Sequence, residues 1–101
     1  MPKLSNSELR VVVFAERGMW VGQCLEYDIC SQASSLLSLR NRIRALIWVE
    51  REFGDVEADG PFYGIQPAPM HFHEMWNQGL SIHDMPNWRA FGSPPACDGV
   101  S

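Results

Sequence analysis

The segment LRVVVFAERGMWVGQCLEY, residues 9–27, carries the strongest structural signal in this chain of 101 residues. Its first part, residues 9–16, is rich in the β-branched and aromatic side chains that are typical of strands. Arg17-Gly18 interrupts this run, and glycine can adopt the positive φ that a tight hairpin turn requires. The segment therefore predicts a β-hairpin of two antiparallel strands, residues 9–16 and 19–27.

A third short strand and then a long helix are expected next. The strand is predicted at residues 29–33, and Ser34-Ser35 can cap the first turn of the helix. From there the hydrophobic period changes from two residues to about 3.6, which predicts a helix over residues 36–53 that ends at Gly54. Its apolar stripe, which a small sheet needs as a cover, consists of Leu36, Leu39, Ile43, Leu46, Ile47 and Phe53.

The second half of the chain has weaker periodicity. Residues 55–69 carry prolines and glycines that exclude a regular helix, so a loop packed on the domain through Phe62, Tyr63 and Ile65 is expected. A short helix is predicted at residues 70–78, begun by Pro69 and ended by Gly79. The side chains expected to share its apolar face are Phe72, Met75, Trp76 and Leu80. An extended tail follows from Ser81 onward, anchored by Met85, Trp88 and Phe91 and frayed at its end.

Together these elements predict one α+β domain: a three-stranded antiparallel β-meander covered by one long helix, then a Pro-rich loop, a short second helix and a tail over residues 54–101. An apolar fraction of 46% excludes a disordered acidic segment. No apolar run approaches the roughly 20 residues of a membrane helix, and the first residues lack the apolar stretch of a secretory signal. A cytoplasmic protein with no membrane partner is therefore expected.

Charge bears on the class of partner, and cysteine content bears on the redox compartment. The net charge is −4, which disfavours nucleic acid as the default partner. Three cysteines without a CxxC spacing fit a reduced compartment better than a disulfide scaffold. Cys24 and Cys30 lie among apolar residues, so they are expected to act as small hydrophobic side chains.

One side of the predicted long helix combines arginines with large apolar residues. Three arginines fall beside the apolar stripe, next to a leucine and a tryptophan, while Arg42 points elsewhere. Exposed tryptophan beside arginine is typical of interface hot spots, although a solvated helix face is the alternative. Of the four tryptophans, Trp76 and Trp88 fit an interface or a closed core equally well. The candidate partner-binding residues are Leu37, Arg40, Arg44, Trp48 and Arg51.

Catalysis and metal binding have weaker support. His71, His73 and His83 are weak metal candidates, because residues two apart on a helix point about 200° apart and cannot share one ion. His73 is instead expected to pack beside Trp76, with His71 solvated. No nucleophile motif or phosphate loop is present, and the strand carboxylates Glu16 and Glu26 lie at opposite ends of the hairpin. A non-enzyme without a cofactor is therefore expected.

The order of predicted elements over residues 9–52 resembles the HicB antitoxin family. Trp20-Val21 matches a W-V element of that family, and SQASSL at residues 31–36 matches its turn into the helix. The later GIQPAP and FHEMW stretches, residues 64–69 and 72–76, look like the ending of a group of short bacterial HicB-like proteins. The resemblance implies a partial ribonuclease-H-like fold that neutralises a HicA toxin, a small mRNA-cleaving protein. Many members also carry a C-terminal DNA-binding domain. The residues after Gly54 depart from that pattern, because they offer no basic recognition element, so a branch without this domain is expected.

The resulting functional hypothesis is a non-catalytic HicB-like protein-interaction module, either a toxin-neutralising antitoxin or its relic, with a small HicA-like toxin as the implied partner. A homodimer is also expected, because an exposed edge strand can pair with a second copy. The alternative is an RNA-binding protein that uses the basic stripe Arg40, Arg44 and Arg51. A third hypothesis, a metal-dependent enzyme, would be centred on His71, His73 and His83.

Overall fold

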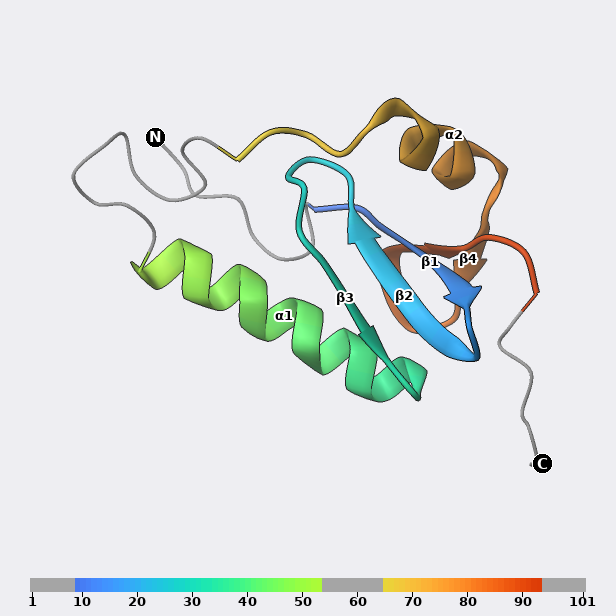
Figure 1. Ribbon diagram of the computed structural model, residues 1–101, viewed down its shortest axis with the longest axis horizontal. Helices are drawn as coiled ribbons and strands as arrows, with labels where there is room; N and C mark the ends of the chain where they lie inside the picture. The colour runs from blue at the N-terminus through green and yellow to red at the C-terminus, as the bar shows by residue number, and fades with distance from the viewer. Residues whose placement is uncertain (1–8, 54–64, 94–101) are drawn as a thin grey trace.

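Five strands and two helices form an α+β fold in the computed structural model, which describes residues 9–53 and 65–93 (Figure 1). The predicted helix end at Gly54 and the predicted packing of Phe62 and Tyr63 lie outside the described residues, as does the end of the tail. The elements in chain order are β1 (Val11–Glu16), β2 (Met19–Cys24), β3 (Cys30–Ala33), α1 (Leu36–Phe53), α2 (Met70–Gln78), β4 (Leu80–Ile82) and β5 (Met85–Ala90).

The sheet has the order β3-β2-β1-β5-β4 and is mixed. The predicted antiparallel meander is present as β1, β2 and β3, and the connecting turn has positive φ at both Arg17 (55°) and Gly18 (78°). Two positive φ values in a two-residue turn match the right-handed twist of the flanking strands. The predicted hairpin is therefore confirmed, with strands slightly shorter than the sequence pattern suggests.

The extended tail predicted from Ser81 onward is wrong. Residues 80–90 form the antiparallel pair β4–β5, and β5 pairs in parallel with β1, with Val11 opposite Trp88. This hairpin could not be predicted from the sequence pattern because it is irregular. Pro86 interrupts it, Asn87 has a φ of 66°, and the strand register shifts between Ser81 and Ile82. Such irregularity removes the two-residue alternation that predicts a strand.

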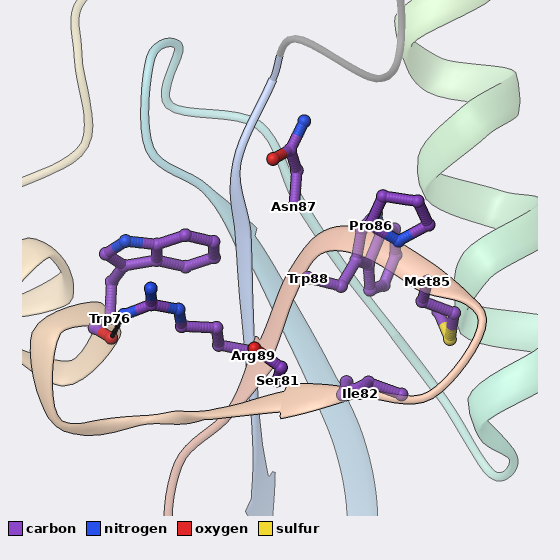
Figure 2. Close-up of a pocket in the computed structure, with 8 residues that line it drawn as sticks. All are labelled: Trp76, Ser81, Ile82, Met85, Pro86, Asn87, Trp88 and Arg89. Atoms are coloured by element: carbon purple, nitrogen blue, oxygen red, sulfur yellow. Dashed lines mark hydrogen bonds between the residues drawn. The ribbon is translucent and has the colours of Figure 1, made fainter.

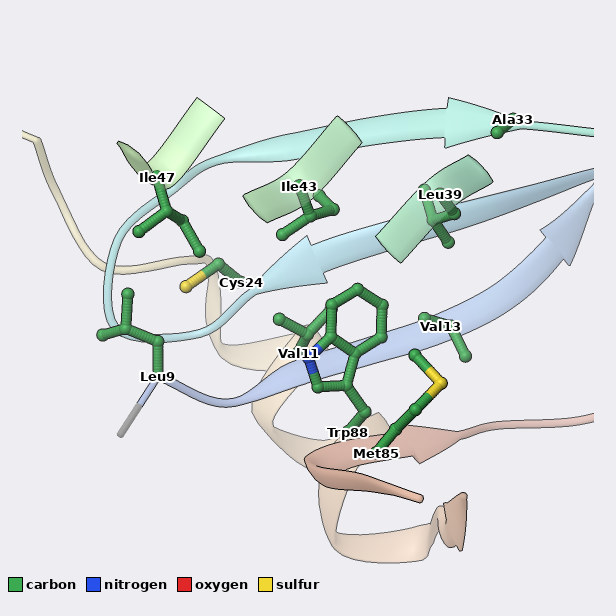
Figure 3. Close-up of a cluster of buried hydrophobic side chains, with 10 residues drawn as sticks. All are labelled: Leu9, Val11, Val13, Cys24, Ala33, Leu39, Ile43, Ile47, Met85 and Trp88. Carbon is green, nitrogen blue, oxygen red and sulfur yellow. The ribbon is translucent and has the colours of Figure 1, made fainter. Parts of the chain in front are cut away.

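One face of the sheet is covered by α1, as predicted. Ser35 caps the helix, because its Oγ accepts a hydrogen bond from the Ser38 amide at 3.1 Å. Figure 3 shows three side chains of the apolar stripe pointing from α1 into the core above β1 and β2: Leu39, Ile43 and Ile47. The prediction for Leu46 is wrong, since this side chain is 42% exposed. It lies on the flank of α1 beside Ser31 of the edge strand β3, where the sheet ends.

The opposite face is covered by α2, which spans the residues predicted for it (Figure 1). Pro69 stands before the helix and Gly79 ends it in an extended conformation, with a φ of −82°. Because the chain leaves the helix directly into β4, Leu80 is 77% exposed and does not share the apolar face as predicted. The second hydrophobic cluster joins α2 to the sheet through Val12, Leu25 and Trp76, with Phe72, Met75 and Phe91 packed around them.

The tryptophans Trp76 and Trp88 close the two sides of the core. Their side chains are 8% and 7% exposed, so the core alternative is the one that the structure confirms. Met85 is buried beside Trp88 (Figure 3). Ile65 is partly buried against the same cluster. The predicted anchors Met85 and Trp88 therefore hold the second half of the chain to the domain as parts of β5, and Phe91 packs after the strand against the other cluster.

Replacing one core leucine of α1 tests this packing against an exposed neighbour. Leu39→Ala removes a fully buried side chain, so the free energy of unfolding should fall by about 2–4 kcal/mol. Leu37→Ala, the matched control on the same helix, removes a side chain that is 59% exposed and should change it by less than about 0.5 kcal/mol. Urea denaturation of both variants measures the difference, and equal losses would contradict the assigned orientation of α1.

Candidate partner-binding surface and a second pocket

The predicted partner-binding residues lie along one side of α1, pointing away from the buried stripe. Leu37 and Trp48 are 59% and 53% exposed, and Arg44 between them is exposed as well. Spacings of seven and four residues keep these three side chains on one side of a helix. We call this set, Leu37, Arg44 and Trp48, the α1 outer surface.

Arg40 and Arg51 lie at the border of the α1 outer surface and are half-buried. The Nε atom of each is buried, so part of the guanidinium group is covered as well as the aliphatic stem. The Arg40 Nε atom is buried and has no hydrogen-bond partner among the residues that the structure describes. The structure thus brings together all five predicted residues but divides them into an exposed centre and a half-buried margin.

The other flank of α1 forms a shallow apolar groove that the sequence analysis missed. Arg42, predicted to point away from the other arginines, does so and donates a hydrogen bond from Nη1 to the Gln32 carbonyl oxygen at 3.3 Å. Beside it, Leu46 and Val49 are 42% and 48% exposed. These residues, with Ser31 and Ala45, line a groove of about 360 Å³ between α1 and β3. The one indication of this groove in the sequence was Val49, an apolar residue of the predicted helix that falls outside the buried stripe.

Strand β3 lies at one edge of the sheet. The backbone N–H and C=O groups of its successive residues point alternately toward β2 and away from the sheet. The Cys24 amide donates to the Ile29 carbonyl oxygen at 2.9 Å, so Cys30 and Gln32 occupy the positions that turn their backbone outward. The carbonyl group of Gln32 is one of these outward groups, and it accepts the hydrogen bond from Arg42. A charged side chain at such a position is a common protection against unwanted strand pairing.

The two described cysteines occupy contrasting environments. Cys24 is fully buried in the core, and this burial raises the pKa of its thiol above the ordinary value. As the pH rises, the thiol of Cys24 therefore loses its proton in the unfolded chain before it does so in the folded protein. Its contribution to the free energy of unfolding declines above about pH 8.5. Cys30 is exposed on β3, so the prediction that it lies in apolar surroundings as a small hydrophobic side chain is wrong.

The candidate histidines are placed apart. His71 is exposed on α2 and its ring lies 4.0 Å from that of Phe72, while His73 is half-buried on the same helix. His83 lies in the β4–β5 turn, 3.2 Å from the Asp84 carboxylate, and both side chains are more than four-fifths exposed. Across residues 9–53 and 65–93, no three His, Cys, Asp or Glu side chains form a group able to hold a metal ion.

A second feature centres on Trp76, where two guanidinium groups meet one indole. The Cζ atoms of Arg89 and Arg10 lie 4.4 Å and 5.7 Å from the ring centroid. Arg10 is paired with Glu26 at 2.6 Å, whereas Arg89 Nη1 donates to the Trp76 carbonyl oxygen at 3.0 Å. Beside Arg89 lies a pocket of about 180 Å³, shown in Figure 2. Neither arginine could be predicted for this site from the sequence, because the three residues come from distant segments.

Thiol labelling tests the contrast between the cysteines. A Cys24→Ala, Cys97→Ser variant retains Cys30 and should react with a thiol reagent as fast as an unfolded peptide, because that side chain is exposed. A Cys30→Ser, Cys97→Ser variant retains Cys24 and should react only at the rate of unfolding, because the thiol is buried and its pKa is raised. Rapid labelling of Cys24 in the folded protein would contradict its place in the core.

No helix in the described part of the chain is long and apolar enough to cross a membrane. Comparison of the chain with models of protein families, with curated proteins and with solved structures found no match. The resemblance of residues 9–52 to the HicB family therefore stays a prediction from the residues themselves.

Proposed function

We propose that this chain is a non-catalytic, HicB-like protein-interaction module that binds a protein partner through the α1 outer surface. The observation that carries the proposal is the exposure of Leu37 and Trp48, 59% and 53%, on a helix whose opposite face already fills the core. Burial of apolar surface by a partner contributes a favourable free energy of roughly 25 cal/mol for each Å² removed from water. Tryptophan and arginine together are the side chains most often found at interface hot spots.

The order of elements supports the HicB-like part of the proposal. β1, β2, β3 and α1 follow one another as the resemblance implies, and the SQASSL stretch runs from β3 into the first turn of α1. On this basis the proposed partner is a small toxin-like protein of the HicA kind. The exposed Arg44 favours acidic groups on the partner's facing surface.

A second candidate, RNA binding, is favoured by one observation on the same helix. α1 carries four arginines and two glutamates, so it is locally positive within a chain of net charge −4. A phosphate backbone would be held by the exposed arginines Arg42 and Arg44, which lie on different flanks of the helix. Protein binding is preferred because the exposed leucine and tryptophan favour an apolar partner surface.

Pull-down of the tagged chain from its native cells, followed by mass spectrometry and light scattering, tests the proposed partner. We expect a stoichiometric small protein in the eluate, and Leu37→Asp and Trp48→Ala should each weaken the reconstituted complex at least about thirtyfold. Leu80→Asp is the matched control, because Leu80 is 77% exposed on β4, away from α1. A bare homo-oligomer in the eluate, or equal losses for the Leu37 and Leu80 variants, would contradict the proposal.

Salt dependence separates the two candidates. RNA binding through α1 would show as an anisotropy change with a single-stranded RNA that weakens steeply from about 50 mM to about 200 mM salt. Under the preferred proposal we expect no such binding at the lower salt concentration. Specific RNA binding that is abolished by Arg44→Gln and retained by Leu37→Asp would replace protein recognition as the function of the α1 outer surface.

A further inference from the structure

One flank of the molecule places a sheet edge beside an apolar groove. β3 has a neighbouring strand on one side only, because it is the first strand in the order β3-β2-β1-β5-β4. The groove between β3 and α1 is lined by Ser31, Arg42, Ala45, Leu46 and Val49, none of which belongs to the α1 outer surface. This flank is therefore a separate contact surface from the one proposed for the protein partner.

The outward backbone groups of β3 match those of a second β3 that runs antiparallel to it. Cys30 and Gln32 turn their N–H and C=O groups away from β2, whereas Ser31 between them pairs with Gly22. When a two-fold axis passes beside Ser31, Cys30 of each copy lies opposite Gln32 of the other, and each pair exchanges both of its N–H···O bonds. Arg42 does not exclude this pairing, because the Gln32 carbonyl oxygen that accepts its hydrogen bond has a second lone pair.

The position of α1 suits the same axis. Leu39 of α1 packs directly on Gly22 of β2, and Arg42 reaches Gln32 of β3, so the helix lies over the space between these two strands. Neighbouring strands are about 4.8 Å apart, which puts the helix about 5 Å from an axis just outside β3 and about 10 Å from its symmetry mate. Packed helices lie about 8–10 Å apart. Pairing of β3 with its copy therefore brings the two α1 helices to an ordinary contact distance.

The side of α1 that meets its copy at this axis is apolar at its centre and complementary in charge toward its ends. Leu46 and Val49 are 42% and 48% exposed, and they lie beside Ser31 in the groove. Two antiparallel α1 helices would bury these side chains against each other. Arg42 and Glu52 are both exposed and lie toward opposite ends of the helix, so antiparallel packing brings Arg42 of one copy toward Glu52 of the other.

We propose that a second copy of this chain binds at this flank, so that a homodimer forms with one continuous sheet through β3 and with adjacent α1 helices. A second copy is preferred to an unrelated strand because the backbone pairing, the helix spacing and the charges are all self-complementary. The dimer leaves the α1 outer surface of both copies accessible. It therefore goes beyond the proposed function and does not depend on it.

Sedimentation equilibrium of the full chain at concentrations up to about 1 mM tests the dimer. We expect the average mass to rise from that of one chain toward that of two. Leu46→Asp should weaken this association at least about tenfold, because it places a charge in the apolar contact. Leu37→Asp, the matched control on the α1 outer surface, should change it by less than about twofold. A chain that stays a monomer at this concentration, or equal losses for the two variants, would overturn the proposal.

Exchange of two charges tests the antiparallel packing of α1. Arg42→Glu should weaken dimerisation at least about threefold, because the new carboxylate meets Glu52 of the other copy. The double variant Arg42→Glu, Glu52→Arg should recover most of this loss, since opposite charges again face each other. A double variant that dimerises no better than Arg42→Glu contradicts the packing.

Cross-linking at the axis tests the register without weakening the contact. In a Cys30→Ser, Cys97→Ser background, Ser31→Cys places two thiols directly opposite each other, at a Cα separation of about 4.5 Å that a disulfide can span. Ser81→Cys, the matched control on the exposed edge strand β4, should form at least about tenfold less disulfide-linked dimer.

The natural Cys30 supplies a second check on this register. In the proposed dimer Cys30 lies diagonally across from its copy, at a Cα separation of about 7–8 Å that is too long for a disulfide. A chain that retains Cys30, with Cys97→Ser, should therefore cross-link little. Faster cross-linking through Cys30 than through the Ser31 variant, or equal cross-linking of the Ser31 and Ser81 variants, would overturn the proposed interface.

Discussion

The burial of β1 on both faces is the constraint on which the rest of this structure depends. Its first three residues, Val11, Val12 and Val13, are at most 1% exposed. Alternation sends Val11 and Val13 into the cluster under α1 and Val12 into the cluster under α2. A strand of this kind requires cover on two sides and a hydrogen-bonding neighbour along each edge. The two helices supply the cover, and β2 and β5 supply the neighbours.

This arrangement gives the two halves of the chain different surfaces. α1 covers the sheet with Leu39, Ile43 and Ile47. The exposed apolar side chains on its other sides do not contribute to the protein's own core. On the opposite face, α2 is shorter than α1, and its Trp76 carries two arginines against its ring. The exposed apolar side chains of α1 and the arginines around Trp76 therefore lie on opposite faces of the sheet.

Features that depend on neighbouring residues could be predicted from the sequence. The period changes from two to about 3.6 residues near Ser35, and α1 begins there; Gly18 and Gly79 stand where a turn and a helix end were expected. The exposure of Leu37 and Trp48 also follows from the helical spacing. The parallel pairing of β1 with β5 could not be predicted, because it depends on contacts between distant segments and β5 lacks regular alternation. The grouping of Arg10, Trp76 and Arg89 was missed for the same reason, since that pairing brings them together.

The pairing of Val11 with Trp88 has a consequence for the order in which the protein folds during synthesis. The two residues are 88 − 11 = 77 positions apart, so the hairpin and α1 leave the ribosome long before the strand that completes the sheet. Until β5 arrives, β1 has an open edge and the cluster under α1 lacks Met85 and Trp88. An open apolar edge is a site of aggregation, and contacts between distant segments slow folding. During synthesis, residues 9–53 therefore expose apolar surface and a strand edge that only the second half of the chain covers.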